Sequence, residues 1–342
     1  MPHNFWKELK RPILALAPMA NVTDAAFRQM FMECGQPDVL WTEFVSVEAL
    51  LSAGKDRALI DLWHGKDEHP IVAQIFGAKP EQFEAACRML RDLGFDGIDI
   101  NMGCPDRSVE KQGAGAGLIK NPSLAKEIIR AAKRGAGGLP VSVKTRIGYA
   151  RNEIATWLPA LLEEDIAALT VHLRTRDEMS DVPARWNLAP DIAELRNRIA
   201  PDTLVIGNGD AASAADAREK ALGAGIDGVM IGRGVFGDPW FFSGRKPDIA
   251  ERLDRMATHA EIFEKIYRSD REDRLKNFDV MKKHFGAYAA GFKGAKELRV
   301  RLMKTETAAE VRRVVREFLA GQNLLLGIEE RKKGVYSSCD QH

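Results

Sequence analysis

Eight short apolar segments between residue 13 and about residue 240 constrain the fold more strongly than any other feature of this chain. They are rich in β-branched residues and are bounded by Gly, Pro, Asn or Asp, a pattern typical of β-strands. Amphipathic stretches such as 80–93 and 122–134 lie between most of them, begin with Pro and are followed by Gly, as helices often are. The eight segments are 13–17, 39–44, 71–76, 97–101, 141–145, 168–172, 203–208 and 228–232.

The number of strand–helix units discriminates among the α/β folds. Eight units in about 240 residues match a (β/α)8 TIM barrel, whereas an open doubly wound sheet more often has about five to seven strands. No Gly-x-Gly-x-x-Gly motif follows the first segment. The strand pattern stops after Phe242, and residues 248–326 predict three or four helices. We therefore predict a TIM barrel at 1–244, a C-terminal all-α helical-bundle domain at 245–326 and a polar tail at 327–342.

Charge is distributed unequally between these parts. The 342 residues carry 50 Lys+Arg and 49 Asp+Glu, a net charge of +1. Residues 245–342 hold 22 Lys+Arg against 16 Asp+Glu, a net charge of +6, which leaves 28 against 33, or −5, for residues 1–244. A basic helical module on an acidic barrel is consistent with polyanion binding, and an ordinary solvated helix surface is the alternative.

Cysteine usage and hydropathy limit the class of protein. The four cysteines, at 34, 87, 104 and 339, include no Cys-x-x-Cys pair, which argues against zinc ribbons, iron–sulfur clusters and a secreted disulfide framework. The N-terminus is short and mixed, and no apolar run approaches the roughly 18 residues of a membrane span. We expect a reduced, cytoplasmic protein without a metal site or a membrane segment.

Two glycine-rich loops follow the seventh and eighth predicted strands. They are Gly207-Asn208-Gly209-Asp210 and Gly232-Arg233-Gly234. TIM barrels place their active sites at the carboxyl ends of the strands and commonly bind phosphate after strands 7 and 8, where glycine lets backbone N–H groups approach closely. Arg233 would add a fork of donors. Two tight turns that need positive φ are the alternative, and the adjacency of the two loops favours phosphate.

Other strand ends carry polar residues suited to a heterocycle. Lys144 has the strand parity of Ser142, so it either faces the barrel interior, where it needs an anionic partner, or extends to solvent. His172 has the parity of Thr170 and is either part of the site or structural. Together with Gln74, these residues form a donor-rich set suited to the pyrimidine edge of a flavin.

Cys104 lies in Gly103-Cys104-Pro105, just beyond the fourth predicted strand. The turn would present its thiol to the barrel mouth, and an ordinary thiol with a pKa of about 8.5 is mostly protonated near neutral pH and can act as a general acid. A cysteine is otherwise usually a small buried apolar residue, which we assign to Cys34 and Cys87. Cys339 lies in the polar tail and is given no role.

The motifs resemble those of the tRNA-dihydrouridine synthase family. The segment 98–105, followed by Val109 and Gly115-Ala116, matches the family signature. Further matches occur in the family's order and extend the resemblance over about residues 12–305. They are Ala17-Pro18-Met19, Val22-Thr23-Asp24, Phe27-Arg28, Lys144-Thr145-Arg146, His172 with Arg174-Thr175, the two glycine loops, and the helical segment around Lys282-Lys283-His284-Phe285, Gly291 and Glu297-Leu298-Arg299.

The resemblance implies FMN-dependent reduction of uridine to 5,6-dihydrouridine in tRNA, with NADPH as reductant. Hydride would pass from flavin N5 to uracil C6 while Cys104 protonates C5. Asn101 would contact the flipped uracil, and Arg146 is a candidate on the substrate side. Lys282 and Lys283 would belong to the RNA-binding module, and the protein would act as a monomer. The residues implied to hold FMN are Pro18, Met19, Gln74, Lys144, His172, Asn208, Gly209, Asp210, Gly232 and Arg233.

The sequence departs from the family in one loop. Leu173 stands where a glycine often follows the histidine, and residues 177–181 contain no counterpart of a common tyrosine.

Four other functions compete with this interpretation. They are an FMN-dependent oxidoreductase of a free pyrimidine, an iron–sulfur enoate reductase, an RNA-binding module without catalysis, and a lyase that uses Lys144 as a Schiff base. The basic helical module argues against the first, the scattered cysteines against the second, and the retention of Cys104, Lys144 and His172 against the third. Bound FMN would exclude the fourth.

Overall fold

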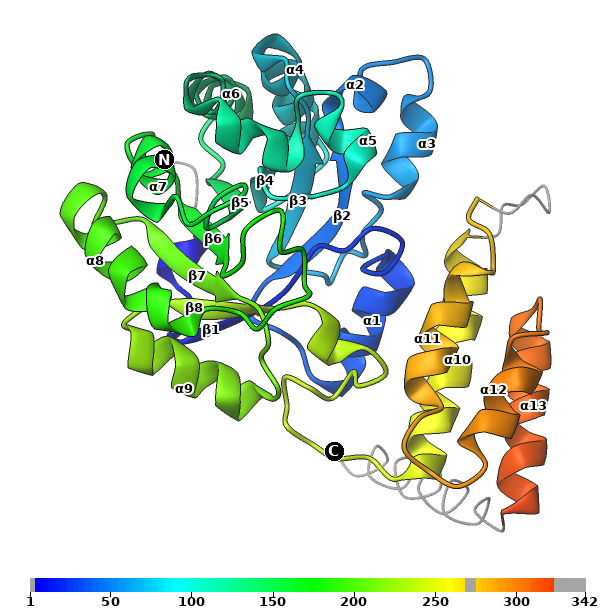
Figure 1. The fold of residues 1–342 in the computed structure, drawn as a ribbon. Helices are drawn as coiled ribbons and strands as arrows, with labels where there is room; N and C mark the ends of the chain where they lie inside the picture. Colours follow the sequence, from blue (N-terminus) through cyan, green and yellow to red (C-terminus); the bar gives the residue numbers. More distant parts are fainter. Residues whose placement is uncertain (1–3, 268–274, 323–342) are drawn as a thin grey trace, which may run out of the picture. The chain divides into compact units, whose positions relative to one another are not determined.

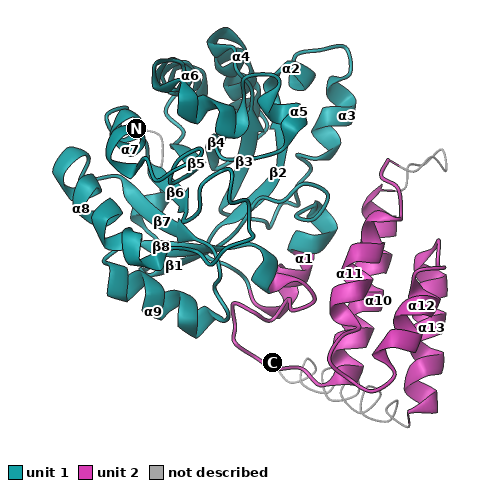
Figure 2. Cartoon of the chain, viewed as in Figure 1, with its two compact units in different colours: residues 1–28, 36–234 teal, residues 29–35, 235–342 magenta. Residues whose placement is uncertain are grey.

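A computed structural model describes residues 4–267 and 275–322, which fold into two compact units (Figures 1 and 2). The first unit comprises the chain up to Arg28 and Gln36–Gly234, and the second comprises Gln29–Gly35 and the chain from Val235 onward. The sequence predicts the domain boundary at residue 244. In the structure the chain passes from the first unit into the second after Gly234. The predicted polar tail at 327–342 and Cys339 fall outside the described residues.

The first unit is a barrel of eight parallel strands in the order β1-β8-β7-β6-β5-β4-β3-β2. A parallel bridge between Ala15 and Val39 joins β1 to the chain that leads into β2, and Leu16 N–H donates to the Val39 carbonyl at 3.1 Å, so the sheet closes on itself. The TIM-barrel prediction is confirmed, and every predicted strand is present with ends shifted by at most two residues. The strands are β1 (Ile13–Leu16), β2 (Leu40–Ser46), β3 (Ile71–Phe76), β4 (Gly97–Asn101), β5 (Val141–Arg146), β6 (Ala168–His172), β7 (Leu204–Asn208) and β8 (Gly228–Ile231).

Helices connect the strands and surround the barrel (Figure 1). The predicted helices at 80–93 and 122–134 correspond to α4 and α6, each with Pro in its first turn, and Asn121 caps α6 by accepting from Leu124 N–H. A Cβ on Gly135 would lie 2.1 Å from the Glu84 carbonyl oxygen, so glycine there allows α6 to pack closely on α4. The helices of this unit are α1 (Ala25–Cys34, shared with the second unit), α2 (Val47–Leu50), α3 (Lys55–Ile60), α4 (Pro80–Asp92), α5 (Arg107–Glu110), α6 (Pro122–Ala136), α7 (Ile154–Leu162), α8 (Ala189–Ile199) and α9 (Ala214–Ala224), with 3-10 turns η1 (Phe5–Lys7), η2 (Gly115–Lys120), η3 (Trp186–Leu188) and η4 (Arg233–Val235).

The amino ends of the strands are closed by apolar side chains. Phe5 and Trp6 of η1 are buried, and the Trp6 ring packs against Trp41 at a centroid distance of 5.8 Å. They join an apolar cluster that fills the barrel with strand residues of small and large volume. The strand members of this cluster are Ile13, Ala15, Trp41, Val72, Ala168, Leu204, Ile206 and Met230. The barrel is therefore solid at this end, and any ligand site lies at the opposite, carboxyl end.

The second unit is helical, and its described part contains α10 (Ile249–Tyr267), α11 (Val280–Tyr288), α12 (Ala295–Leu302) and α13 (Ala308–Gly321). Thr307 caps α13 by accepting from Glu310 N–H. The core contains large apolar side chains from all four helices, among them Phe263, Phe285, Leu298 and Val315. The prediction of an all-α C-terminal domain with three or four helices is confirmed.

Two kinds of feature are absent from the described residues. Within 4–267 and 275–322, no helix combines the length and hydropathy of a membrane span. In the same ranges, no three or more His, Cys, Asp or Glu side chains converge as they would on a metal ion.

Candidate active site

A cavity of about 640 Å³ lies at the carboxyl ends of β1 and β5–β8. Among the residues predicted to hold a cofactor, only Gln74 does not line it. Side chains that are dispersed in the sequence thus meet in one cavity. The lining residues are Ala17, Pro18, Met19, Lys144, His172, Arg174, Ser180, Asn208, Gly209, Asp210, Ala211, Ala212, Met230, Ile231, Gly232, Arg233 and Gly234.

One wall of the cavity is formed by the two glycine loops. Gly209 has φ +126°, and a Cβ there would lie 2.7 Å from the Ala184 Cβ, so this position requires glycine. Asn208 joins the ends of β7 and β8 by donating to the Met230 carbonyl at 2.8 Å. The Arg233 side chain is 65% exposed, and its Nη2 lies 3.7 Å from Asp210 Oδ1. A glycine-lined backbone and an accessible guanidinium suit an anionic group such as a phosphate.

A buried arginine that the sequence analysis did not assign to the site connects this wall to β6. Arg174 donates to Asp210 Oδ2 at 2.5 Å, to the Val182 carbonyl at 2.5 Å and to His172 Nε2 at 3.1 Å. Burial alone would raise the pKa of Asp210, but hydrogen bonds from Arg174 and from the Ala184 N–H hold it below its usual value. The Asp210 carboxylate is thus occupied by hydrogen bonds within the protein. We therefore expect a ligand to contact the Asp210 backbone and not its side chain.

The same contact fixes the protonation of His172. An arginine has only donors, so Nε2 is an acceptor and the proton of the neutral ring is on Nδ1. Burial, followed by the charges of Arg146, Lys144 and Arg174, lowers the pKa of His172 well below its ordinary value. His172 is therefore a neutral imidazole at neutral pH, with one N–H to donate.

Lys144 lines the cavity and so faces the barrel interior, the first of the two orientations that the strand parity left open. On the neighbouring strands its register partners are Asn101 and Thr170. Burial, and then the charge of Arg146, lowers the pKa of Lys144 to about 8, while the charges of Asp99 and Cys104 act in the opposite direction. At neutral pH the side chain is an ammonium with little solvent around it, which is suited to binding an anion.

Gln74 does not line the cavity and belongs to a buried chain of hydrogen bonds. Its Nε2 donates to Asp99 Oδ2 at 2.6 Å, and its Oε1 accepts from Asn101 Nδ2 at 3.0 Å. Ser142 donates to the other Asp99 oxygen at 2.5 Å. Burial raises the pKa of Asp99 to about 6, although hydrogen bonds from Ser142 and Gln74 and the charge of Lys144 oppose the shift. Asp99 anchors this chain and was missed as a site residue, although an Asp inside an apolar strand is a detectable signal.

The loop that carries Cys104 is fixed by its own neighbours. Asn101 Oδ1 accepts from the Gly103 and Cys104 N–H groups at 3.1 and 2.9 Å, and the Cys104 carbonyl accepts from Ala116 N–H at 3.0 Å. Gly115 has φ +58°, and a Cβ there would lie 2.8 Å from the Cys104 carbonyl oxygen. The half-buried thiol packs against an apolar cluster of Phe76, Val109 and Ala114.

Burial raises the pKa of Cys104, and a hydrogen bond to the backbone of Asp106 and the charges of Lys144 and Arg146 offset this only in part. The thiol is therefore protonated at neutral pH, as a general acid must be. Cys104 itself does not line the 640 Å³ cavity.

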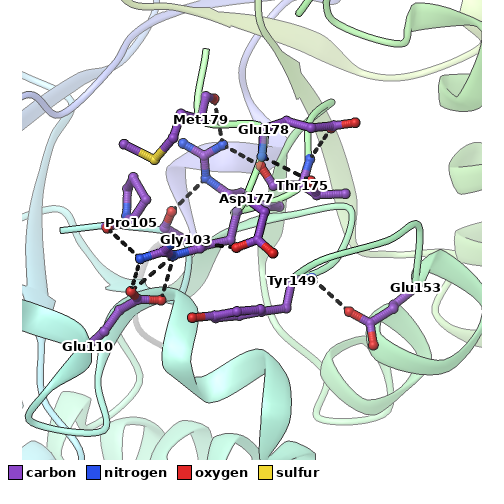
Figure 3. A network of polar contacts seen from close by, with 11 residues as sticks. Gly103, Pro105, Glu110, Tyr149, Glu153, Thr175, Asp177, Glu178 and Met179 are labelled. Carbon is purple, nitrogen blue, oxygen red and sulfur yellow. Dashed lines mark hydrogen bonds and ion pairs between the residues drawn. The ribbon is translucent and has the colours of Figure 1, made fainter. Parts of the chain in front are cut away.

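The remaining predicted substrate residues lie in different settings. Arg146 donates through Nε to the Gly103 carbonyl at 2.8 Å and through Nη1 to the Thr175 and Met179 carbonyls, both at 2.9 Å (Figure 3). In the second unit, Lys282 pairs with Asp279 at 2.6 Å and Lys283 is exposed on the same helix, α11. Leu173, the departure after His172, is buried.

Fold and site together define a TIM-barrel protein whose cavity is lined by Lys144, Arg174 and Arg233. The chain belongs to the dihydrouridine synthase family, whose model matches residues 15–323, and it is therefore an enzyme. It is 46% identical over 324 residues to a probable tRNA-dihydrouridine synthase of Staphylococcus aureus (strain Mu50 / ATCC 700699), covering 94% of this chain and 97% of that one. It is 44% identical over 322 residues to a probable tRNA-dihydrouridine synthase 2 of Bacillus subtilis (strain 168), covering 93% and 97%. The family resemblance in the sequence is thereby confirmed.

Proposed function

We propose that this protein reduces uridine in tRNA to 5,6-dihydrouridine, using FMN bound in the cavity, NADPH as the reductant and Cys104 as the proton donor. The observation that carries the proposal is the Cys104 loop, which holds a protonated thiol between backbone hydrogen bonds at the carboxyl end of β4. Family membership, which rests on the match over residues 15–323, supports the substrate and the reaction.

The residues around the cavity fit FMN. The Gly209 position would be filled by any Cβ, the cavity volume of about 640 Å³ is in the range of cofactor sites, and Arg233 and Lys144 supply cations at two places on the lining. In the proposal, the phosphate is held by Arg233 and the backbone of 208–210 and 232–234. The isoalloxazine is proposed to be held by Pro18, Met19, Lys144 and His172, while Gln74, which does not line the cavity, would hold Asn101 in place.

FMN, once reduced by NADPH, would supply the hydride for C6 of the uracil. The Cys104 thiol donates its proton to C5, so the C5–C6 double bond becomes a single bond and the cysteine is left as a thiolate. The charges of Lys144 and Arg146 favour that thiolate, because both act to lower the pKa of Cys104. Asn101 has one amide hydrogen left after its bond to Gln74, and this hydrogen is proposed to contact the uracil.

The second unit is proposed to bind tRNA through its basic surface, with Lys282 and Lys283 on α11 among the phosphate contacts. A base inside an RNA helix cannot reach a barrel cavity, so the uridine must leave its stack. Grip on the flanking backbone by Lys and Arg would offset the cost of that step. The protein is proposed to act as a monomer in the cytoplasm.

The test is a reaction with unmodified tRNA transcript. The purified protein is expected to contain one non-covalent FMN, and with NADPH it should form dihydrouridine, detected by mass spectrometry of the digested RNA. Free uridine serves as the control substrate. Turnover of free uridine or uracil at the rate seen with tRNA would favour an FMN-dependent oxidoreductase of free pyrimidines, and protein that neither contains nor binds FMN would refute the proposal.

A further inference from the structure

The two carbonyl groups that flank Cys104 are both contacted by arginines from other loops. Arg146, at the end of β5, donates to the Gly103 carbonyl at 2.8 Å, and Arg176, in the loop after β6, donates to the Pro105 carbonyl at 3.4 Å (Figure 3). Cys104 therefore lies between two residues whose backbone oxygens are fixed from outside their own loop.

Arg176 is itself held by Glu110, the last residue of α5. Its Nε lies 2.9 and 3.0 Å from the two Glu110 carboxylate oxygens, and Nη2 also donates to Glu110 Oε2. The side chains of Arg176 and Glu110 are only 19% and 12% exposed. A shielded, bidentate arginine–carboxylate pair is stronger and better defined in direction than an exposed ion pair.

The Arg176 guanidinium also lies near an aromatic ring. Its carbon is 5.4 Å from the centroid of the Tyr149 ring, and Lys120 Nζ lies 3.4 Å from the same centroid. Both cations are within the range of cation–π attraction. Tyr149 thus limits the orientations that the Arg176 side chain can adopt.

The backbone of the β6 loop is tied to the β5 loop as well. Arg176 N–H donates to the Gly148 carbonyl and Asp177 N–H donates to the Tyr149 carbonyl, each at 3.0 Å. Tyr149 N–H in turn donates to Glu153 Oε2 at 2.7 Å (Figure 3). Arg176 therefore extends from a segment that is held by hydrogen bonds, so its side chain can fix the position of the Cys104 loop.

We propose that Arg176 and Glu110 are positioning residues for the proton donor, and that with Arg146 they form a clasp which holds the Cys104 loop at the distance and angle that proton transfer requires. We refer to Arg146, Arg176 and Glu110 as the arginine clasp. The inference rests on the proposed role of Cys104. Its physical basis is that displacement of a reacting group by about 1 Å can lower a rate by about 10²-fold.

The chain contains a matched control for this pair. Arg130 on α6 donates through Nε and Nη2 to the two oxygens of Glu164 at 2.7 and 2.8 Å, so it forms the same bidentate contact. Glu164 lies between α7 and the start of β6, at the amino end of that strand and away from Cys104. Glu164→Gln thus removes a bidentate ion pair with a buried carboxylate, although Arg130 is more exposed than Arg176, and it does not touch the Cys104 loop.

The experiment measures the tRNA-dependent reoxidation of pre-reduced holoenzyme in a single turnover. The variants are Glu110→Gln, Arg176→Gln, Arg176→Lys, Cys104→Ala and the control Glu164→Gln. We expect Glu110→Gln and Arg176→Gln to lower the rate constant about 10- to 100-fold, with KM for tRNA and affinity for FMN within about twofold of wild type. Arg176→Lys, which keeps the charge and loses the fork, should give an intermediate rate.

A second measurement separates positioning from stability. Alkylation of Cys104 by iodoacetamide, followed on the Cys104 peptide by mass spectrometry, should become several-fold faster in Glu110→Gln than in Glu164→Gln, because the loop is released. If Glu110→Gln does not fold, Glu110→Asp, which keeps the carboxylate but shortens its reach, carries both measurements. If the melting temperature falls equally in Glu110→Gln and Glu164→Gln, a difference between their alkylation rates is not explained by lost stability.

The outcomes separate the clasp from the proposed function. If Cys104→Ala abolishes reoxidation while Glu110→Gln and Arg176→Gln react within about twofold of Glu164→Gln, the clasp is refuted and the proton donor stands. If Cys104→Ala itself reacts at the wild-type rate, the proposed proton donor is wrong and the clasp has nothing to position.

Discussion

Three cations at the carboxyl end of the barrel, Lys144, Arg146 and Arg174, are largely buried, whereas Lys282 and Arg301 of the helical unit are paired near its surface. Lys144, Arg146 and Arg174 converge in a segment, residues 1–244, whose net charge is −5. In the segment with a net charge of +6, Lys282 pairs with Asp279 and Arg301 pairs with Glu317. Net charge is thus a poor guide to where a single anion binds. A buried cation attracts a nearby anion strongly on its own. Exposed cations attract an anion weakly and collectively, and salt screens that attraction.

The largest expected effect is at the barrel mouth. Cys104→Ala should retain FMN and reduction by NADPH, yet lose about 10²–10⁴-fold in uridine reduction, because a positioned acid contributes about that much. Dihydrouridine formation in tRNA transcript gives the rate. Cys34→Ala, a half-buried cysteine in α1, is the control and should react normally. Turnover of Cys104→Ala near the wild-type rate would contradict the role of Cys104 as proton donor at the barrel mouth.

The next effect concerns the glycine loops. Arg233→Ala should weaken FMN binding about ten- to hundredfold, because the phosphate no longer accepts a charge-assisted hydrogen bond from this side chain. Fluorescence titration of the apoprotein with FMN measures this. Arg218→Ala, an exposed arginine on α9 that does not line the cavity, should leave the affinity unchanged. Equal affinities in the two variants would place the phosphate elsewhere.

A third prediction concerns the interior of the helical unit, which also contains buried titratable groups. His259 and His284 are fully buried with ring centroids 4.8 Å apart, and burial lowers the pKa of His259 to about 3. Burial, with the charges of His259 and Lys283, also lowers the pKa of His284. The unfolded chain binds protons at these rings below about pH 6.5 and the folded chain does not, so stability falls as the pH falls.

For His259 alone the loss of unfolding free energy between pH 7 and pH 5 should be about 2 kcal/mol, or roughly thirtyfold in the folding equilibrium. Urea unfolding followed by circular dichroism at the two pH values measures it. His259→Phe should flatten the dependence on pH, because the unfolded chain then has one fewer ring that binds a proton in this range. An unchanged pH dependence in His259→Phe would show that this ring is protonated in the folded state.

The smallest effect is expected at the surface of α11. Lys282→Ala with Lys283→Ala should weaken tRNA binding about two- to tenfold, the scale of exposed ion pairs. The slope of log K against log salt should flatten by up to about 0.7–0.9 for each phosphate that is no longer neutralised. Lys7→Ala with Lys10→Ala, at the closed end of the barrel, is the control. If the slopes of the two double variants coincide with that of the wild type, tRNA is held by another surface.

Local pattern is sufficient to predict the barrel, since β-branched segments bounded by Gly, Pro, Asn or Asp define strands wherever they occur. It is also sufficient for most of the cavity lining, because in a TIM barrel strand-end residues converge at one end regardless of their separation in sequence. It fails for contacts that depend on tertiary partners. Glu110 and Arg176 are 66 residues apart, and nothing near either residue indicates the other. The sequence assigns Gln74 to the cofactor site but does not reveal its hydrogen bonds to Asp99 and Asn101, and in the structure Gln74 does not line the cavity.

The apolar seal formed by Phe5 and Trp6 has a kinetic consequence. Because apolar side chains fill the amino end of the barrel, we expect ligands to reach the cavity from the carboxyl end, and in the proposed function both the flavin and the uridine enter there. In the proposed function, FMN is then expected to bind before the uridine. A tRNA seated on the mouth would also block the way out, so the dissociation rate constant of FMN is expected to fall when tRNA is bound. Bound substrate would therefore prolong the residence time of the cofactor.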